Sequence, residues 1–178
     1  MKIAVFCSAN EHIDPEFFVR AEELGRWMAT EGHTLVFGGT DMGLMKCIAR
    51  AVHEEGGHTI GVVPSLVEER GRTSRYNDVE IPCDNLSDRK DLMLLQSDVV
   101  IALPGGLGTL DEIFTVVASA TIGYHHKRVI LYNIKDFWTP LLSLLDQLQT
   151  QGLVRGHYTD HIVSACSLNE IKLLLADI

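Results

Sequence analysis

The chain has 178 residues, 46% of them hydrophobic, and a net charge of −9 at pH 7. This length and composition are sufficient for one well-buried domain, and no linker, repeat or low-complexity segment marks a second, so we predict a single domain over residues 1–178. The acidic balance, without a basic run interleaved with aromatic residues, argues against nucleic acid as a partner. The chain opens on an apolar strand and has no run of about 18 apolar residues, so we expect a cytoplasmic protein without a membrane contact.

Apolar runs and helical spacings alternate along the chain. The runs predict strands near 2–7, 34–37, 58–63, 98–103 and 128–132, and the helical spacing predicts helices near 15–31, 43–55, 86–96, 109–122 and 137–150. This order is typical of a doubly wound parallel sheet, so we predict an α/β, Rossmann-like fold with helices on both faces. Segment 64–82 has no clear periodicity and is predicted to be a mobile surface loop.

The first two predicted strands lead into small or polar residues. The first continues as Cys-Ser-Ala-Asn at 7–10, and the second continues as a glycine turn that begins at Gly38. Ligands of open parallel sheets gather at the carboxyl ends of the strands. We therefore expect both segments to approach a phosphate or a sugar. Ahead of the fourth strand, Arg89 and Lys90 lie in a charged helix start, for which local ion pairs and solvation are the simplest interpretation.

Residues 99–112 carry the most information in the chain. A β-branched strand runs into a stretch with three glycines and then into a helix, and such a turn offers unpaired backbone N–H groups and a positive dipole end to an anion. The sequence Thr109-Leu110-Asp111-Glu112 also fits a capping box, in which Thr109 caps the helix and Glu112 bonds back to it. Taken alone, this segment is compatible with a phosphate site or with a structural turn.

The pattern GGxxxGLM at 38–45, the Arg89-Lys90 pair and PGGxGTxxE at 104–112 resemble the LOG family of cytokinin riboside 5′-monophosphate phosphoribohydrolases. The resemblance covers nearly the whole chain. It implies hydrolysis of the N-glycosidic bond of a nucleoside 5′-monophosphate to free base and ribose 5-phosphate, without a cofactor. Some members have been labelled lysine decarboxylases, but a short chain with six lysines gives no support for a pyridoxal phosphate site.

Carried over residue by residue, the resemblance assigns catalysis to Arg89 and Glu112. It assigns substrate binding to a larger set: Ser8, Gly38, Gly39, Gly43, Met45, Arg89, Lys90, Gly105, Gly106, Gly108 and Thr109. It also implies a homodimer formed through helices that flank the site, and the helix at 109–122 is apolar around most of its circumference, as a helix buried on two sides would be.

Glycosidic cleavage develops positive charge on the sugar, which a carboxylate stabilises. A position in the first helical turn favours the ionised form of Glu112, suited to stabilising charge or orienting water rather than to donating a proton. Arg89 stays charged and would clamp phosphate or ribose and position Glu112. Because glutamine can also complete a capping box, the sequence predicts that Glu112→Gln abolishes turnover without loss of stability.

Several residues depart from the family pattern, and so the identity of the base is left open, with AMP as the default. The departures are Thr40, Lys46, Leu86-Ser87-Asp88, Thr115, Ser119 and Thr121. A nucleotide or cofactor carrier without turnover is the main alternative function. A dinucleotide-linked oxidoreductase is disfavoured because no GxGxxG follows the first strand. His157 and His161 have the spacing of a zinc pair on a helix, but no third ligand is evident and we predict no metal.

Overall fold

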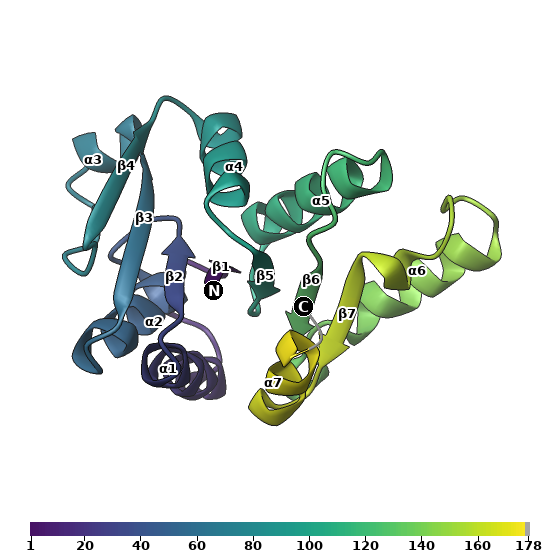
Figure 1. The fold of residues 1–178 in the computed structure, drawn as a ribbon, viewed down its shortest axis with the longest axis horizontal. Coiled ribbons are helices and arrows are strands. Elements are labelled where there is room, and N and C mark those ends of the chain that lie inside the picture. The colour runs from purple at the N-terminus through teal and green to yellow at the C-terminus, as the bar shows by residue number, and fades with distance from the viewer. Residues whose placement is uncertain (177–178) are drawn as a thin grey trace.

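The computed structural model describes residues 1–176, and within them seven strands form one all-parallel sheet in the order β4-β3-β2-β1-β5-β6-β7 (Figure 1). The α/β, Rossmann-like fold is therefore confirmed. The strands have these bounds: β1 Lys2–Phe6, β2 Thr34–Phe37, β3 His58–Pro64, β4 Val79–Cys83, β5 Val99–Ala102, β6 Val129–Tyr132 and β7 Ile162–Ala165.

Helices cover both faces of the sheet. Their bounds are α1 Pro15–Thr30, α2 Gly43–Glu54, α3 Ser65–Glu69, α4 Leu86–Leu95, α5 Leu107–Thr121, α6 Thr139–Thr150 and α7 Leu168–Ala176, with 3-10 turns η1 Ile134–Asp136 and η2 Tyr158–Asp160. Helices α1, α2 and α7 lie on one face and α4, α5 and α6 on the other (Figure 1). Their buried side chains form one core on each face. In residues 1–176 no helix is both long enough and apolar enough to cross a membrane.

The prediction of a mobile loop over 64–82 is wrong. The segment contains α3 and most of β4, and its middle is hydrogen-bonded to the glycine turn that begins at Gly38. The Ser74 N–H donates to the Gly39 carbonyl over 2.7 Å, and Thr73 forms an antiparallel bridge with Thr40. The edge strand β4 escaped prediction because it buries only Cys83 fully and therefore shows no run of apolar residues.

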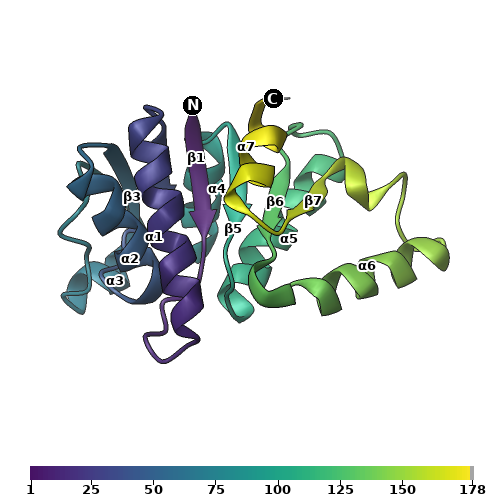
Figure 2. The same ribbon diagram turned by 90° about the horizontal axis from the view of Figure 1, so that it is seen from below.

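The topology places the candidate site between β1 and β5. The chain leaves β1 toward one face of the sheet and leaves β5 toward the other, so the loops that follow these strands diverge and leave a crevice. The Ser8 N–H donates to the Pro104 carbonyl over 3.2 Å, which holds the two loops together. In Figure 2, β1 runs downward from the N-terminus, so the carboxyl ends of the strands and the loop after β1 lie at the bottom.

Candidate active site

Helix α5 begins without a side-chain cap. Its N-cap is Gly106, no side chain bonds to this end, and the first backbone bond of the helix runs from the Leu110 N–H to the Gly106 carbonyl. The predicted capping box is therefore wrong: Thr109 lies inside the first turn and Glu112 in the second. Gly106, Gly108 and Thr109 line the crevice at the end of β5, and the N–H groups of a first helical turn have no intrahelical acceptor.

Glu112 is bound to Arg89 instead of to its own helix. The Arg89 guanidinium donates from Nη2 to Glu112 Oε1 over 2.7 Å, and the two side chains are 12% and 7% exposed. Arg89 comes from the first turns of α4, 23 residues earlier in the chain. A charge-assisted bond in this buried setting fixes the position of the carboxylate. The two residues assigned to catalysis by resemblance thus lie in direct contact.

The charge state of Glu112 has a different cause from the one that the sequence suggested. Burial raises the pKa of the Glu112 carboxyl above its ordinary value, while Arg89, by its charge and its hydrogen bond, opposes that rise. The position of Glu112 beyond the first turn removes most of the expected dipole effect. Arg89 is therefore the group that favours the ionised carboxylate, and a carboxylate with a raised pKa is a better proton acceptor than an exposed one.

A second ion pair joins the same two helices. The ammonium group of Lys90 lies 2.8 Å from each carboxylate oxygen of Asp111. The interpretation of Arg89 and Lys90 as locally paired cations is wrong, because both pair across to α5. Lys90 is not among the residues that line the crevice, so the structure places it beside the site as a link between helices.

The ion pair borders a cavity of about 270 Å³. Its lining residues are Cys7, Ser8, Ala9, Met45, Arg89, Gly106, Gly108, Thr109 and Glu112. Burial, reinforced by the nearby Glu112 charge, raises the pKa of the Cys7 thiol well above its usual range. A protonated thiol is a poor nucleophile, so Cys7 serves as a packing residue at the cavity wall.

The glycines predicted to bind substrate divide into two groups. A Cβ on Gly106 or Gly108 would meet nothing within 4 Å, so the space beside these two is open to a ligand. The others are close to protein atoms: a Cβ on Gly105 would lie 2.0 Å from Thr109 Oγ1, and one on Gly43 would lie 2.5 Å from the Ala9 carbonyl carbon. Gly105 and Gly43 therefore allow close contact between neighbouring segments.

The turn at Gly38 and Gly39 packs against Arg89 and β3 outside the cavity lining. A Cβ on Gly38 would lie 2.8 Å from Arg89 Nη2, so glycine at this position leaves room for the guanidinium where it bonds to Glu112. Gly39 has a φ of +66°, and a Cβ there would lie 2.4 Å from Val63 Cγ2. Neither residue belongs to the cavity lining, whereas Met45, at the start of α2, does.

The two histidines with zinc-like spacing do not lie on one helix face. His157 precedes the 3-10 turn η2 and His161 follows it. Within residues 1–176, no group of three histidine, cysteine or acidic side chains is arranged to hold a metal ion.

Comparison with known proteins decides the family. A family model described as "Possible lysine decarboxylase" matches residues 45–173. The Oryza sativa protein named cytokinin riboside 5′-monophosphate phosphoribohydrolase LOG is 34% identical over 176 residues, which are 99% of this chain and 73% of that protein. The Arabidopsis thaliana protein named cytokinin riboside 5′-monophosphate phosphoribohydrolase LOG5 is 33% identical over 170 residues, which are 96% of this chain and 75% of that protein. The chain belongs to the LOG family.

Solved structures share the complete LOG-family fold. The molybdenum cofactor binding protein from Rippkaea orientalis has a TM-score of 0.74 and 28% identity, covering 99% of this chain and 95% of its own. The Moco carrier protein from Chlamydomonas reinhardtii has a TM-score of 0.73 and 26% identity, and the match covers 99% of this chain and 98% of that protein. The protein TM1055 has a TM-score of 0.78 and 26% identity, covering 99% of both chains. Proteins named for molybdenum cofactor binding or carriage thus share this architecture.

The first prediction concerns the buried ion pair. Arg89→Gln and Glu112→Gln should each lower the free energy of unfolding by about 3 kcal/mol, because each leaves one buried charge without a partner. This corrects the expectation that Glu112→Gln is neutral, which depended on the capping box. The double variant should lose less free energy of unfolding than the two single variants lose together. The difference should be at least about 1 kcal/mol, measured by urea denaturation.

The matched control is the second ion pair between the same helices. Asp111 is 54% exposed, so Lys90→Gln and Asp111→Asn should couple by less than about 1 kcal/mol. Additive losses for Arg89→Gln and Glu112→Gln would contradict the assignment of a coupled buried pair.

Proposed function

We propose that this LOG-family protein hydrolyses the N-glycosidic bond of a nucleoside 5′-monophosphate, AMP or an N6-modified AMP, giving free base and ribose 5-phosphate. The observation that carries this proposal is the contact between Arg89 and Glu112 beside the uncapped start of α5. One cavity thus combines an anion site with an oriented carboxylate. Relatives at 33–34% identity carry the name of this activity.

Each part of the cavity has a role in the proposed reaction. The 5′-phosphate accepts hydrogen bonds from the backbone N–H groups of the first turn of α5, next to Gly106 and Gly108. The ribose extends toward Glu112, whose negative charge stabilises the positive charge that develops at C1′. Glu112 also orients a water molecule, whose oxygen bonds to C1′ as the C1′–N bond breaks. The water loses one proton to Glu112, which returns it to solvent, and the leaving base takes up one proton from solvent.

Arg89 acts through its position as well as its charge. It holds Glu112 by a 2.7 Å bond and favours the ionised carboxylate, while its remaining N–H groups are available to ribose or phosphate oxygens. Gly38 permits this placement because it leaves room for the guanidinium. We therefore assign catalysis to Arg89 and Glu112 and substrate contact to Ser8, Met45 and the start of α5.

Binding of a nucleotide or cofactor without turnover is the second candidate function. It is favoured by the shared fold with two proteins whose names describe molybdenum cofactor binding or carriage. The carboxylate next to the anion site favours an enzyme, because binding an anionic ligand alone does not need a negative charge there.

A direct assay separates the two functions. Wild type, Glu112→Gln and Glu112→Asp are incubated with AMP and with N6-isopentenyl-AMP, and released base is measured by chromatography at a temperature at which circular dichroism shows each variant folded. Glu112→Gln should lose at least about 100-fold in rate, because the charge is removed. Glu112→Asp keeps the charge and should retain more activity. Saturable nucleotide binding without base release by wild type would favour the carrier.

The phosphate site has its own test. Gly108→Ala should leave the melting temperature unchanged or raise it, since alanine is the better helix former, while it lowers the affinity for AMP about tenfold by filling space beside the anion site. Gly105→Ala is the contrasting control, because its Cβ would collide with Thr109 and lower the melting temperature. Wild-type AMP affinity in Gly108→Ala would contradict the proposed placement of the phosphate.

We also propose a homodimer through the face of α5. Phe114 on this helix and Ile122 at its C-cap are 40% and 69% exposed and line one surface cavity, whereas Leu95 and Tyr124 are 73% and 80% exposed and line another. Exposed large apolar side chains gathered around one helix are typical of an interface. Light scattering at micromolar concentration should give twice the chain mass of 19.7 kDa, and a monomer mass would contradict the proposal.

A further inference from the structure

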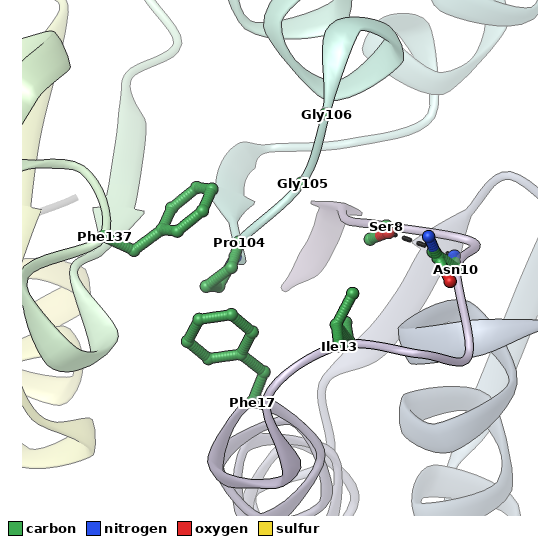
Figure 3. A pocket seen from close by; sticks show the side chains of 8 residues that line it. All are labelled: Ser8, Asn10, Ile13, Phe17, Pro104, Gly105, Gly106 and Phe137. Carbon is green, nitrogen blue, oxygen red and sulfur yellow. Dashed lines mark hydrogen bonds between the residues drawn. The ribbon is translucent and has the colours of Figure 1, made fainter.

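A second cavity adjoins the candidate active site and is lined mainly by apolar residues (Figure 3). It has a volume of about 240 Å³, and we call it the aromatic chamber. Its lining residues are Ser8, Asn10, Ile13, Phe17, Pro104, Gly105, Gly106 and Phe137. They come from the loop after β1, the start of α1, the loop after β5 and the residue that follows η1. None of the roles proposed above uses Asn10, Ile13 or either phenylalanine.

Two phenylalanine rings give the chamber its chemical character. The ring centroids of Phe17 and Phe137 lie 5.6 Å apart at 76°, an edge-to-face arrangement. Phe137 also packs at 83° on the buried Trp138, which holds its ring in place. Figure 3 shows both phenylalanine rings close to Pro104 at one end of the chamber. A site of apolar rings and backbone is suited to a planar aromatic group.

The other end of the chamber is polar. The Asn10 N–H donates to Ser8 Oγ over 3.0 Å (Figure 3). The His12 N–H donates to Asn10 Oδ1 over 2.8 Å. In both bonds the side chain contributes only its oxygen, as the acceptor. The hydroxyl proton of Ser8 and the side-chain NH₂ group of Asn10 therefore remain available as donors to a ligand. The chamber therefore offers aromatic surface at one end and hydrogen-bond donors near the glycine loop.

The chamber and the active-site cavity are joined through shared residues. Ser8 and Gly106 line both, whereas Arg89 and Glu112 line only the active-site cavity. At about 240 and 270 Å³, each cavity is smaller than the roughly 300–1,000 Å³ that is usual for a small-molecule site. Because they meet beside the start of α5, one ligand with a central phosphate would occupy both.

The placement of the phosphate decides which group enters the chamber. In a 5′-nucleotide the phosphate and the base lie at opposite ends of the ribose. If the phosphate lies at the start of α5 and C1′ lies at Glu112, the base lies beyond Glu112 and points away from the chamber. Only a group bonded to the other side of the phosphate, opposite the ribose, can then enter the chamber. The occupant must then be a second group attached through that phosphate, and the two phenylalanines select an aromatic one.

We propose that the aromatic chamber binds the second ring system of a pyrophosphate-linked dinucleotide, so that this protein takes such dinucleotides in addition to nucleoside monophosphates. The inference rests on the proposed position of the phosphate at the start of α5. The first nucleotide lies between that phosphate and Glu112. The bridging pyrophosphate lies beside Ser8 and Gly106, and the second base packs against Phe17 and Phe137.

The test compares two ligands that differ by one aromatic ring. ADP-ribose and the dinucleotide with two adenosines joined by a 5′,5′-pyrophosphate are titrated into the wild-type protein by calorimetry, with AMP as a third ligand. The dinucleotide should bind about tenfold more tightly than ADP-ribose. Phe17→Leu and Phe137→Leu should each remove this advantage and leave the affinities for ADP-ribose and AMP unchanged. Phe137 is 38% exposed, so its replacement keeps the test valid if Phe17→Leu is unstable.

Phe18→Leu is the matched control, because Phe18 is the next residue of α1 and lines a different surface cavity. It should leave the dinucleotide preference unchanged. Equal affinity of wild type for the dinucleotide and ADP-ribose would overturn the inference. An equal loss of AMP and dinucleotide affinity in Phe17→Leu would also overturn it, because the chamber would then hold the base of the monophosphate.

Base release measured on the same samples keeps this inference separate from the proposed function. A dinucleotide preference without release of base from any ligand would contradict the hydrolase and support the chamber. Release of base from AMP without a dinucleotide preference would support the hydrolase and contradict the chamber.

Discussion

The bond between Arg89 and Glu112 is the interaction on which the candidate site depends. Both groups are almost fully buried, so neither is stable there as an isolated charge. Their contact requires α4 and α5 to lie side by side on one face of the sheet, with the glycine turn after β2 leaving space for the guanidinium. The same contact counteracts the effect of burial on the pKa of Glu112. This one hydrogen bond therefore joins two helices, favours the charged form of Glu112 and positions the carboxylate for the proposed reaction.

The sheet topology places every other part of the site around this bond. Because the chain leaves β1 and β5 toward opposite faces, the crevice opens between their loops, and Ser8 and Gly106 lie on either side of it. The start of α5 supplies backbone donors there without any side-chain cap. An anion is the natural partner of such a helix start, even in a chain with a net charge of −9, since the interaction is local.

The central strands and the helices between them could be predicted because buried parallel strands are continuous apolar runs, as Val99–Ala102 is. The edge strands β4 and β7 were missed for the opposite reason. Val79–Cys83 is largely exposed and contains a proline, and Ile162–Ala165 buries only its first and last residues, so neither carries a buried-strand pattern. Helix α7 follows β7 directly and was missed with it. Local periodicity thus predicts the interior of this sheet better than its edges.

In the site, the motif resemblance pointed to two residues that lie in direct contact in the structure, whereas the local capping rule assigned Glu112 a hydrogen-bond partner that it does not have. A capping box is defined within four residues, whereas Arg89 lies 23 residues away and reaches Glu112 only after α4 and α5 have packed. The chamber residues carry no motif at all. Phe17 and Phe137 become neighbours because η1 lies against α1, a contact that no sequence spacing encodes.

The space beside Gly38 has a consequence for how sequence similarity in this fold is interpreted. This glycine belongs to a pattern that resembles a nucleotide-binding signature, yet its side-chain position is taken up by the Arg89 guanidinium. A larger residue at this position would have to displace the guanidinium that bonds to Glu112. Gly38 therefore provides steric clearance for the Arg89 guanidinium, whereas Met45, in the same pattern, borders the cavity itself. Substrate preference must be encoded by the residues that border the two cavities.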